Sequence, residues 1–134
     1  MSLSNAQVRA TVAVSDLDRA REFYEFRLGL KAEPGGPEMV RIYACGGGTQ
    51  LQVYASPENA GTATATVASW SVDAGDYDAT VDELIANGVE LVTYDGLEAD
   101  DRGVHAFGEH RVAWCEDPDG NVLAIDNGLS PAEM

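Results

Sequence analysis

A DPDG turn divides the stretch 111–127 into two strands of opposite direction. Pro118 presets φ for the second position of a type I turn, and Gly120 supplies the positive φ from which the next strand begins. The residues after the turn alternate between two faces, with Leu123 and Ile125 sharing one of them. The stretch therefore predicts a β-hairpin with one face in the core.

A weaker copy of this hairpin lies earlier in the chain, at 39–54. Aligning the glycines of the two turns pairs Leu51 with Leu123 and Val53 with Ile125. A repeat of this length indicates two related structural units. Because 134 residues of 45% hydrophobic composition suit one compact core, we expect the units to be two halves of a single domain.

The same series of elements precedes each hairpin, so each half is predicted to be β-α-β-β-β. The expected elements are a strand at 8–14, a helix from a Ser15–Asp18 capping box to Gly29, a short strand at 30–33, a second-half strand at 66–72, a helix from Asp76 to Gly88 and a short strand at 89–94. The large difference between the halves is an insertion at 95–109. A loop of that length is typically a lid, a binding loop or a mobile segment.

The formal net charge of −15 argues against nucleic acid and anionic membranes as partners, since both attract clustered Lys and Arg. It is compatible with a cationic ligand, although surface carboxylates that only maintain solubility explain it as well. No apolar run is long enough to span a membrane and no signal peptide is evident, so a cytoplasmic protein is expected. Cys45 and Cys115 lack metal-site spacing and are expected to be reduced, buried thiols.

Two motifs occur in order, V-x-V-S-D-L-D-R-A-x-x-F-Y at 12–24 and W-C-x-D-P-D-G-N at 114–121. They resemble those of the vicinal oxygen chelate superfamily, which includes glyoxalase I, extradiol dioxygenases and the fosfomycin and bleomycin resistance proteins. The resemblance implies an α+β fold for the single domain 1–134. Its two βαβββ modules, about 7–55 and 64–128, would form an incomplete eight-stranded barrel around a cleft, with the helices outside. It also implies a homodimer, because many members complete or cover their clefts with a second subunit.

Metal-using members of this superfamily take His or Glu ligands from the first and fourth strands of each module. The corresponding positions here are Arg9, Gln52 (or Tyr54 if the register shifts by two), Val67 and Ala124. None of these is a strong ligand for a divalent cation, so no metal cofactor is expected. An atypical ligand set is the alternative.

Strand alternation predicts a mixed polar cleft, and we expect it to be formed largely by Arg9, Thr11, Gln52, Tyr54, Ser69, Trp114, Ala124 and Asp126. Arg9 and Asp126 could instead form a structural ion pair, and the face that Trp114 occupies is left open by its alternation with Cys115. Trp70 is expected in the core. No catalytic triad or carboxylate pair is identifiable, so no catalytic residue is assigned.

The insertion contains His105 and Phe107, and we expect one of them to face the ligand if the insertion closes one end of the cleft. An ordinary surface excursion is the alternative, and a solvated loop explains His105 and His110 more simply than a metal site does. The sequence thus predicts a metal-free binding protein of the bleomycin-resistance type for a small, possibly cationic, organic molecule. The alternative is a metal-dependent lyase, isomerase or dioxygenase of the glyoxalase type.

Overall fold

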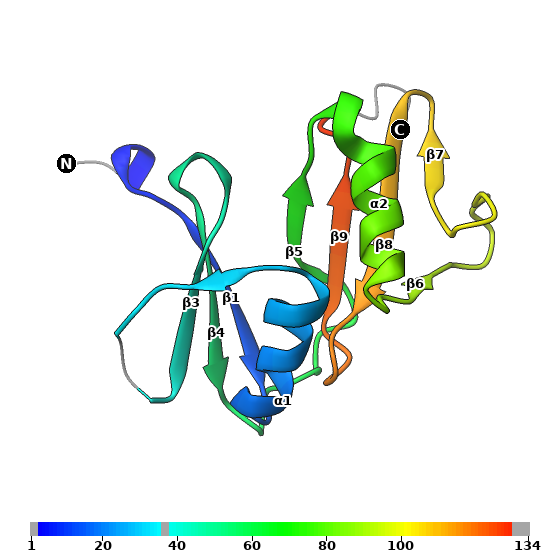
Figure 1. Ribbon diagram of the computed structural model, residues 1–134. Coiled ribbons are helices and arrows are strands. Elements are labelled where there is room, and N and C mark those ends of the chain that lie inside the picture. The colour runs from blue at the N-terminus through cyan, green and yellow to red at the C-terminus, as the bar shows by residue number, and fades with distance from the viewer. Residues whose placement is uncertain (1–2, 36–37, 130–134) are drawn as a thin grey trace.

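The computed structural model describes residues 3–35 and 38–129 and confirms the α+β fold class (Figure 1). Two open sheets, rather than a closed barrel, carry the same strand order in each half: β1-β4-β3-β2 in the first sheet and β5-β9-β8-β6 in the second. The first half contains β1 (Arg9–Val14), α1 (Leu17–Arg21), β2 (Lys31–Ala32), β3 (Val40–Ala44) and β4 (Gln50–Ala55). The second contains β5 (Thr66–Ser71), α2 (Tyr77–Ala86), β6 (Leu91–Val92), β7 (His105–Phe107), β8 (His110–Glu116) and β9 (Val122–Asp126).

The first helix begins at a different cap from the one expected. Asp16, not Ser15, is the N-cap, and its carboxylate accepts the backbone N–H groups of Asp18 and Arg19. A carboxylate at this position also interacts favourably with the helix dipole. Ser15 is free of the capping role because its hydroxyl and N–H both donate to Asp119 in the second half. The helix continues as a π-helical turn, Glu22–Arg27, and the chain leaves it at Gly29 with φ of 78°.

The DPDG turn forms as predicted, and it also joins the two halves. The N–H of Gly120 donates to the carbonyl of Asp117 at 2.9 Å, and Gly120 has φ of 90°. The carboxylate of Asp117 is buried and accepts the hydroxyl of Tyr24 at 2.8 Å, while Asn121 donates its amide to the carbonyl of Ala13 at 2.8 Å. Burial and the neighbouring Asp117 charge raise the pKa of Tyr24, which keeps the hydroxyl protonated as a donor.

The insertion at 95–109 is partly regular, which corrects the expectation of a loop without structure. Within it His105–Phe107 form β7, which pairs with β8 along the same edge as β6 and so extends that edge of the second sheet. The guanidinium of Arg102 lies 2.8 Å from Asp78 and 3.1 Å from Asp82, both on α2, and 3.2 Å from Asp100. The insertion is therefore held against α2 by ion pairs and against the sheet by strand pairing.

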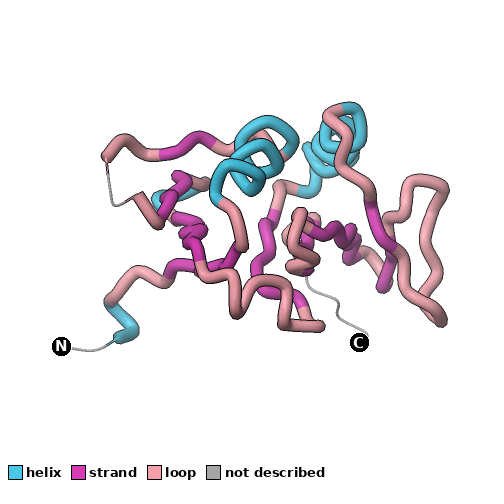
Figure 2. The backbone as a smooth tube through the Cα atoms, turned by 90° about the horizontal axis from the view of Figure 1, so that it is seen from below, coloured by secondary structure: helices cyan, strands magenta, loops and turns pink. Residues whose placement is uncertain are grey.

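Both sheets and both helices share one hydrophobic core. Val12 and Val53 of the first sheet belong to the same buried cluster as Leu123 and Ile125 of the second. In Figure 2 the two helices lie side by side on the same side of the two sheets. The core-forming faces of the sheets are thus turned toward the helices, and the opposite faces are turned outward.

Candidate functional site

The predicted site residues fall on the two outward faces of the sheets, which we call the first and second free faces. Thr11 pairs with Gln52 across β1 and β4, and Ser69 pairs with Ala124 across β5 and β9. These are equivalent pairs in the two halves, because aligning the turn glycines superimposes Gln52 on Ala124. One chain therefore holds the residues as two groups, four on the first sheet and six on the second. Ser69 of the second group lines a groove together with Gln50, which accepts a hydrogen bond from Arg9 of the first group.

The first free face is polar and its groups are hydrogen-bonded to one another. The guanidinium of Arg9 donates to the side-chain oxygen of Gln50 at 3.1 Å and to that of Gln52 at 2.9 Å. Thr11 is exposed between them, and Tyr54 is half-buried at the end of β4. None of the ion pairs formed within 3–35 and 38–129 joins Arg9 to Asp126, whose carboxylate instead accepts the N–H of Gly128.

The second free face carries an aromatic cluster, formed by Trp114, His105 and Tyr94. The ring centroids of His105 and Trp114 lie 4.9 Å apart and those of Tyr94 and Trp114 lie 5.2 Å apart, both in edge-on contact. Trp114 is thus on the free face, while Cys115, the next residue, lies in the core with no exposed surface. Phe107 is farther along β7, where its ring contacts His110 rather than Trp114.

His105 is the unusual member of the cluster. It has no exposed surface, yet neither ring nitrogen has a hydrogen-bond partner among the residues that the structure describes. A buried polar atom without a partner costs about 1–3 kcal/mol. His105 is part of β7, and in the pairing of β7 with β8 it lies opposite Val112.

Two residues of the second free face were not predicted as site residues. Tyr94 follows β6, in which Val92 pairs with Trp114. Because side chains alternate, the residue two places after Val92 lies on the same face, so the strand pattern contained a signal for Tyr94. Thr66 accepts the indole N–H of Trp114 at 3.2 Å, and no sequence signal marks that contact. Burial and then the charge of Glu116 raise the pKa of Tyr94.

The residues at the family's metal-ligand positions do not fit a divalent cation. The amide oxygen of Gln52 already accepts a hydrogen bond from Arg9, and a guanidinium beside it repels a cation. Ala124 and Val67 carry no donor atom at all. Among 3–35 and 38–129, no three His, Cys, Asp or Glu side chains are close enough to hold a metal ion.

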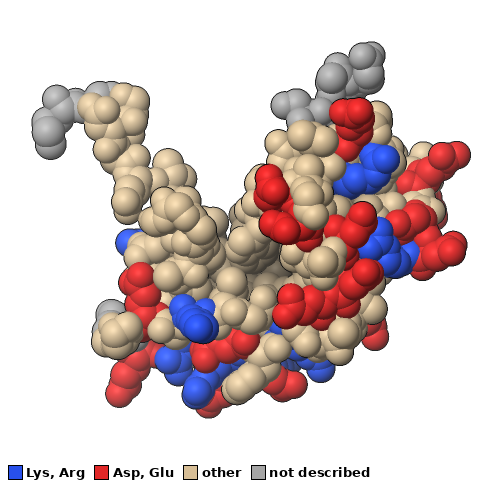
Figure 3. Space-filling view, turned by 45° about the horizontal axis from the view of Figure 1, so that its top comes forward, with Lys and Arg blue, Asp and Glu red and all other residues tan. Residues whose placement is uncertain are grey.

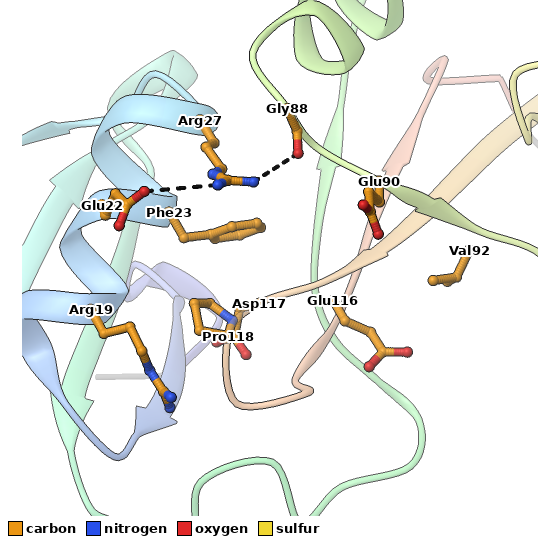
Figure 4. A pocket seen from close by; sticks show the side chains of 10 residues that line it. All are labelled: Arg19, Glu22, Phe23, Arg27, Gly88, Glu90, Val92, Glu116, Asp117 and Pro118. Atoms are coloured by element: carbon orange, nitrogen blue, oxygen red, sulfur yellow. Dashed lines mark hydrogen bonds and ion pairs between the residues drawn. The ribbon is translucent and has the colours of Figure 1, made fainter.

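A concavity lies elsewhere, between the first helical segment and the β8–β9 turn, and none of the predicted site residues lines it (Figure 4). It measures about 450 Å³, and the ring of Phe23 lies at its centre. Arg27 donates to the carbonyl of Gly88 at 2.8 Å and lies 3.8 Å from Glu22, while Arg19 is paired with Asp119. Arg19 and Arg27 thus link the two halves of the molecule, which is a structural role.

Solved structures of similar fold cover nearly the whole chain. A glyoxalase/bleomycin resistance protein from Catenulispora acidiphila is 28% identical, with a TM-score of 0.65 over 90% of this chain and 96% of its own. A bleomycin-binding protein complexed with bleomycin is 21% identical, with a TM-score of 0.66 over 91% and 98%. The fosfomycin resistance protein FosX from Listeria monocytogenes, complexed with Mn(II) and a dihydroxypropylphosphonic acid, is 15% identical, with a TM-score of 0.65 over 96% and 93%.

None of the curated proteins compared with the chain matches it. In the described part of the chain, no helix has both the length and the apolar character needed to cross a membrane. A family model, however, matches residues 6–125. The match includes both βαβββ modules with the motifs at 12–24 and 114–121. The chain therefore belongs to the glyoxalase/bleomycin resistance protein/dioxygenase superfamily.

Proposed function

We propose that the protein binds a small organic molecule on the second free face, against Trp114, without a resident metal ion. The observation that supports this most directly is the aromatic cluster on an outward sheet face. Aromatic rings on a monomer's surface offer flat, apolar contact area together with polar edges, which is the usual composition of a small-molecule site. The bleomycin-binding relative shows that this fold can hold an organic ligand.

His105 gives the proposed site a preference for ligands with polar atoms. Its two ring nitrogens are buried without partners, so a ligand that supplies a donor or an acceptor there removes an existing cost. Reaching His105 requires β7 to shift, because the imidazole has no exposed surface.

The negative charge of the protein supports a cationic ligand. The chain carries −15, and Asp and Glu side chains gather over the second half of the molecule in Figure 3. Asp126, half-buried on the second free face, adds a carboxylate close to the cluster. A field of this sign raises the local concentration of cations and opposes anions.

We further propose that two copies complete the site. Within one chain the two free faces belong to separate sheets, and a two-fold axis would place Arg9, Gln52 and Tyr54 of one copy opposite Trp114 of the other. Such a homodimer has two equivalent sites, and one ligand per chain is expected. The cytoplasmic location expected from the sequence stays part of this proposal.

The test is calorimetric titration with bleomycin as the probe, because it is the organic ligand named for a relative of this fold. Trp114→Ala is expected to weaken binding at least tenfold, since a central aromatic contact is worth about 2 kcal/mol or more. Phe26→Ala is the matched control, because Phe26 is an exposed aromatic residue on the helical side of the molecule. Equal affinity in the two variants would refute the proposed site.

Elemental analysis of the purified protein separates the proposal from metal-dependent lyase, isomerase or dioxygenase chemistry. The proposal expects Mn, Fe, Ni and Zn well below one atom per chain, and probe binding that is unchanged by EDTA. A stoichiometric metal whose removal abolishes binding would overturn the metal-free site.

A further inference from the structure

The first free face carries an arginine that forms no ion pair. Arg9 is exposed at the start of β1, and none of the ion pairs within the described part of the chain includes it. Its guanidinium donates through Nε to Gln50 at 3.1 Å and through Nη1 to Gln52 at 2.9 Å. Both acceptors are neutral amide oxygens. The hydrogen bonds therefore orient the guanidinium without neutralising its charge.

Gln50 also separates Arg9 from a nearby carboxylate. Its side-chain oxygen accepts from Arg9, while its amide nitrogen donates to the two carboxylate oxygens of Glu33 at 3.0 and 3.1 Å. The amide thus takes the place of a direct ion pair between Arg9 and Glu33. Two of the five N–H groups of the guanidinium are used in these contacts, and the other three, including both on Nη2, have no acceptor within 3–35 and 38–129.

The charge of the first free face has the opposite sign to that of the whole chain. Among the outward-facing residues of its four strands, the charged ones are Arg9 and Lys31, and Glu33 follows directly after β2. The face therefore carries +1 (two cations less one carboxylate), whereas the chain carries −15. Lys31 lies on the strand at the opposite edge of the sheet, about 14 Å from β1, so Arg9 is the cation at its own edge.

We propose that Arg9 binds a carboxylate of the ligand and that the ligand is a zwitterion. A carboxylate accepts two N–H groups of a guanidinium in a planar, charge-assisted contact, and three are available here. The field of a chain that carries −15 opposes a simple anion, so a carboxylate reaches Arg9 more readily on a molecule that also carries a cation. The inference rests on the proposed function and names the chemical class of its ligand. In the proposed dimer, the carboxylate contacts Arg9 of one copy and the cationic part contacts Trp114 of the other.

Three small probes test the two ends of such a ligand. The first, para-(aminomethyl)benzoate, is a zwitterion, whereas benzoate carries only the carboxylate and benzylamine only the amine. Binding to the purified protein is followed by two-dimensional NMR. We expect the zwitterion to bind more tightly than the other two probes and to shift the Nε–H signal of Arg9. Arg9→Gln should weaken the zwitterion about tenfold, because the charge-assisted contact is lost, and should leave the affinity for benzylamine unchanged.

Two further variants distinguish a carboxylate contact from a general loss of positive charge. Arg21→Gln removes the same charge from an exposed pair with Glu25 on α1, so its affinity for the zwitterion should match that of wild type. Arg9→Lys keeps the charge but not the planar set of donors, so it should recover only part of the affinity that Arg9→Gln loses.

The role of Gln50 as a positioning residue is tested by rescue. Gln50→Ala leaves the net charge unchanged but frees Arg9 to pair with Glu33, so it should weaken binding of the zwitterion. Adding Glu33→Gln to Gln50→Ala removes the competing carboxylate and should restore binding. A merely structural role for Gln50 predicts no such rescue.

The outcomes separate this inference from the proposed function. Equal affinity for the zwitterion in wild type and Arg9→Gln, equal weakening in Arg9→Gln and Arg21→Gln, or no binding of either carboxylate probe would each overturn the role of Arg9. Tighter binding of benzoate than of the zwitterion would overturn the ligand class. None of these results bears on the bleomycin titration with Trp114→Ala. Conversely, zwitterion binding that depends on Arg9, in a protein whose bleomycin binding is insensitive to Trp114→Ala, supports the carboxylate contact and refutes the aromatic site.

Discussion

Single residues on β8 show how strand alternation separates two chemical environments. Trp114 lies on the free face and Cys115 lies in the core, where burial raises the pKa of the thiol to about 12. The raised pKa means that the folded protein holds this proton at pH values where the unfolded chain has lost it. The stability contributed by Cys115 is therefore complete below pH 9 and is lost as the pH rises toward 12.

The free energy of unfolding is expected to fall by about 1.4 kcal/mol per pH unit from this one group between pH 9 and 12. Burial also raises the pKa of Tyr77, to about 12, which adds to the loss above pH 10. Urea unfolding at half-unit pH steps measures the slope. Between pH 9 and 10, the free energy of unfolding should fall less steeply with pH for Cys115→Ala than for wild type. Cys45→Ala leaves Cys115 in place, so its slope should match that of wild type. Identical slopes in all three proteins would contradict the assignment.

At the scale of elements, a single arginine, Arg102, holds the insertion against α2. Arg102→Ala removes the contacts to Asp78, Asp82 and Asp100. Because these groups are largely solvent-exposed, the loss of global stability is expected to be about 1 kcal/mol or less. Amide exchange should accelerate within 97–105, measured by mass spectrometry, while α1 is unchanged. Arg21→Ala, which breaks the surface pair with Glu25, is the control, and equal exchange in both variants would count against the anchoring role.

The elements that could be predicted are those encoded by neighbouring residues. Alternation predicted β1 and β9, and the hairpin turns predicted β4 and β8. The helix end at Gly29 and the positive φ at Gly120 were predicted from glycine at a helix end and in a turn. The cap of α1 was misassigned because Ser15 forms its hydrogen bonds with Asp119, more than 100 residues away in the sequence. β7 was missed because three residues are too few to show a period, and the site residues Tyr94 and Thr66 depend on which strands become neighbours.

At the scale of the whole molecule, the shared core makes the two halves one cooperative unit. Far-UV circular dichroism and tryptophan fluorescence should report the same single unfolding transition. Asp117→Ala should lower the free energy of unfolding by about 3 kcal/mol, because it leaves Tyr24 and the turn amides without their charged acceptor. Asp101→Ala, at an exposed position of the insertion, should change stability by less than about 0.5 kcal/mol. Two resolved transitions would show that the halves unfold independently.

The outward orientation of the two free faces has an evolutionary consequence. Residues such as Arg9, Thr11 and Ser69 do not belong to the shared core, so their replacement leaves most of the folding free energy intact. A lineage can therefore exchange the chemical groups presented to a ligand without first acquiring compensating mutations. The two βαβββ halves present two such surfaces on one shared core, so either surface can change while the helices and the inner sheet faces keep their packing.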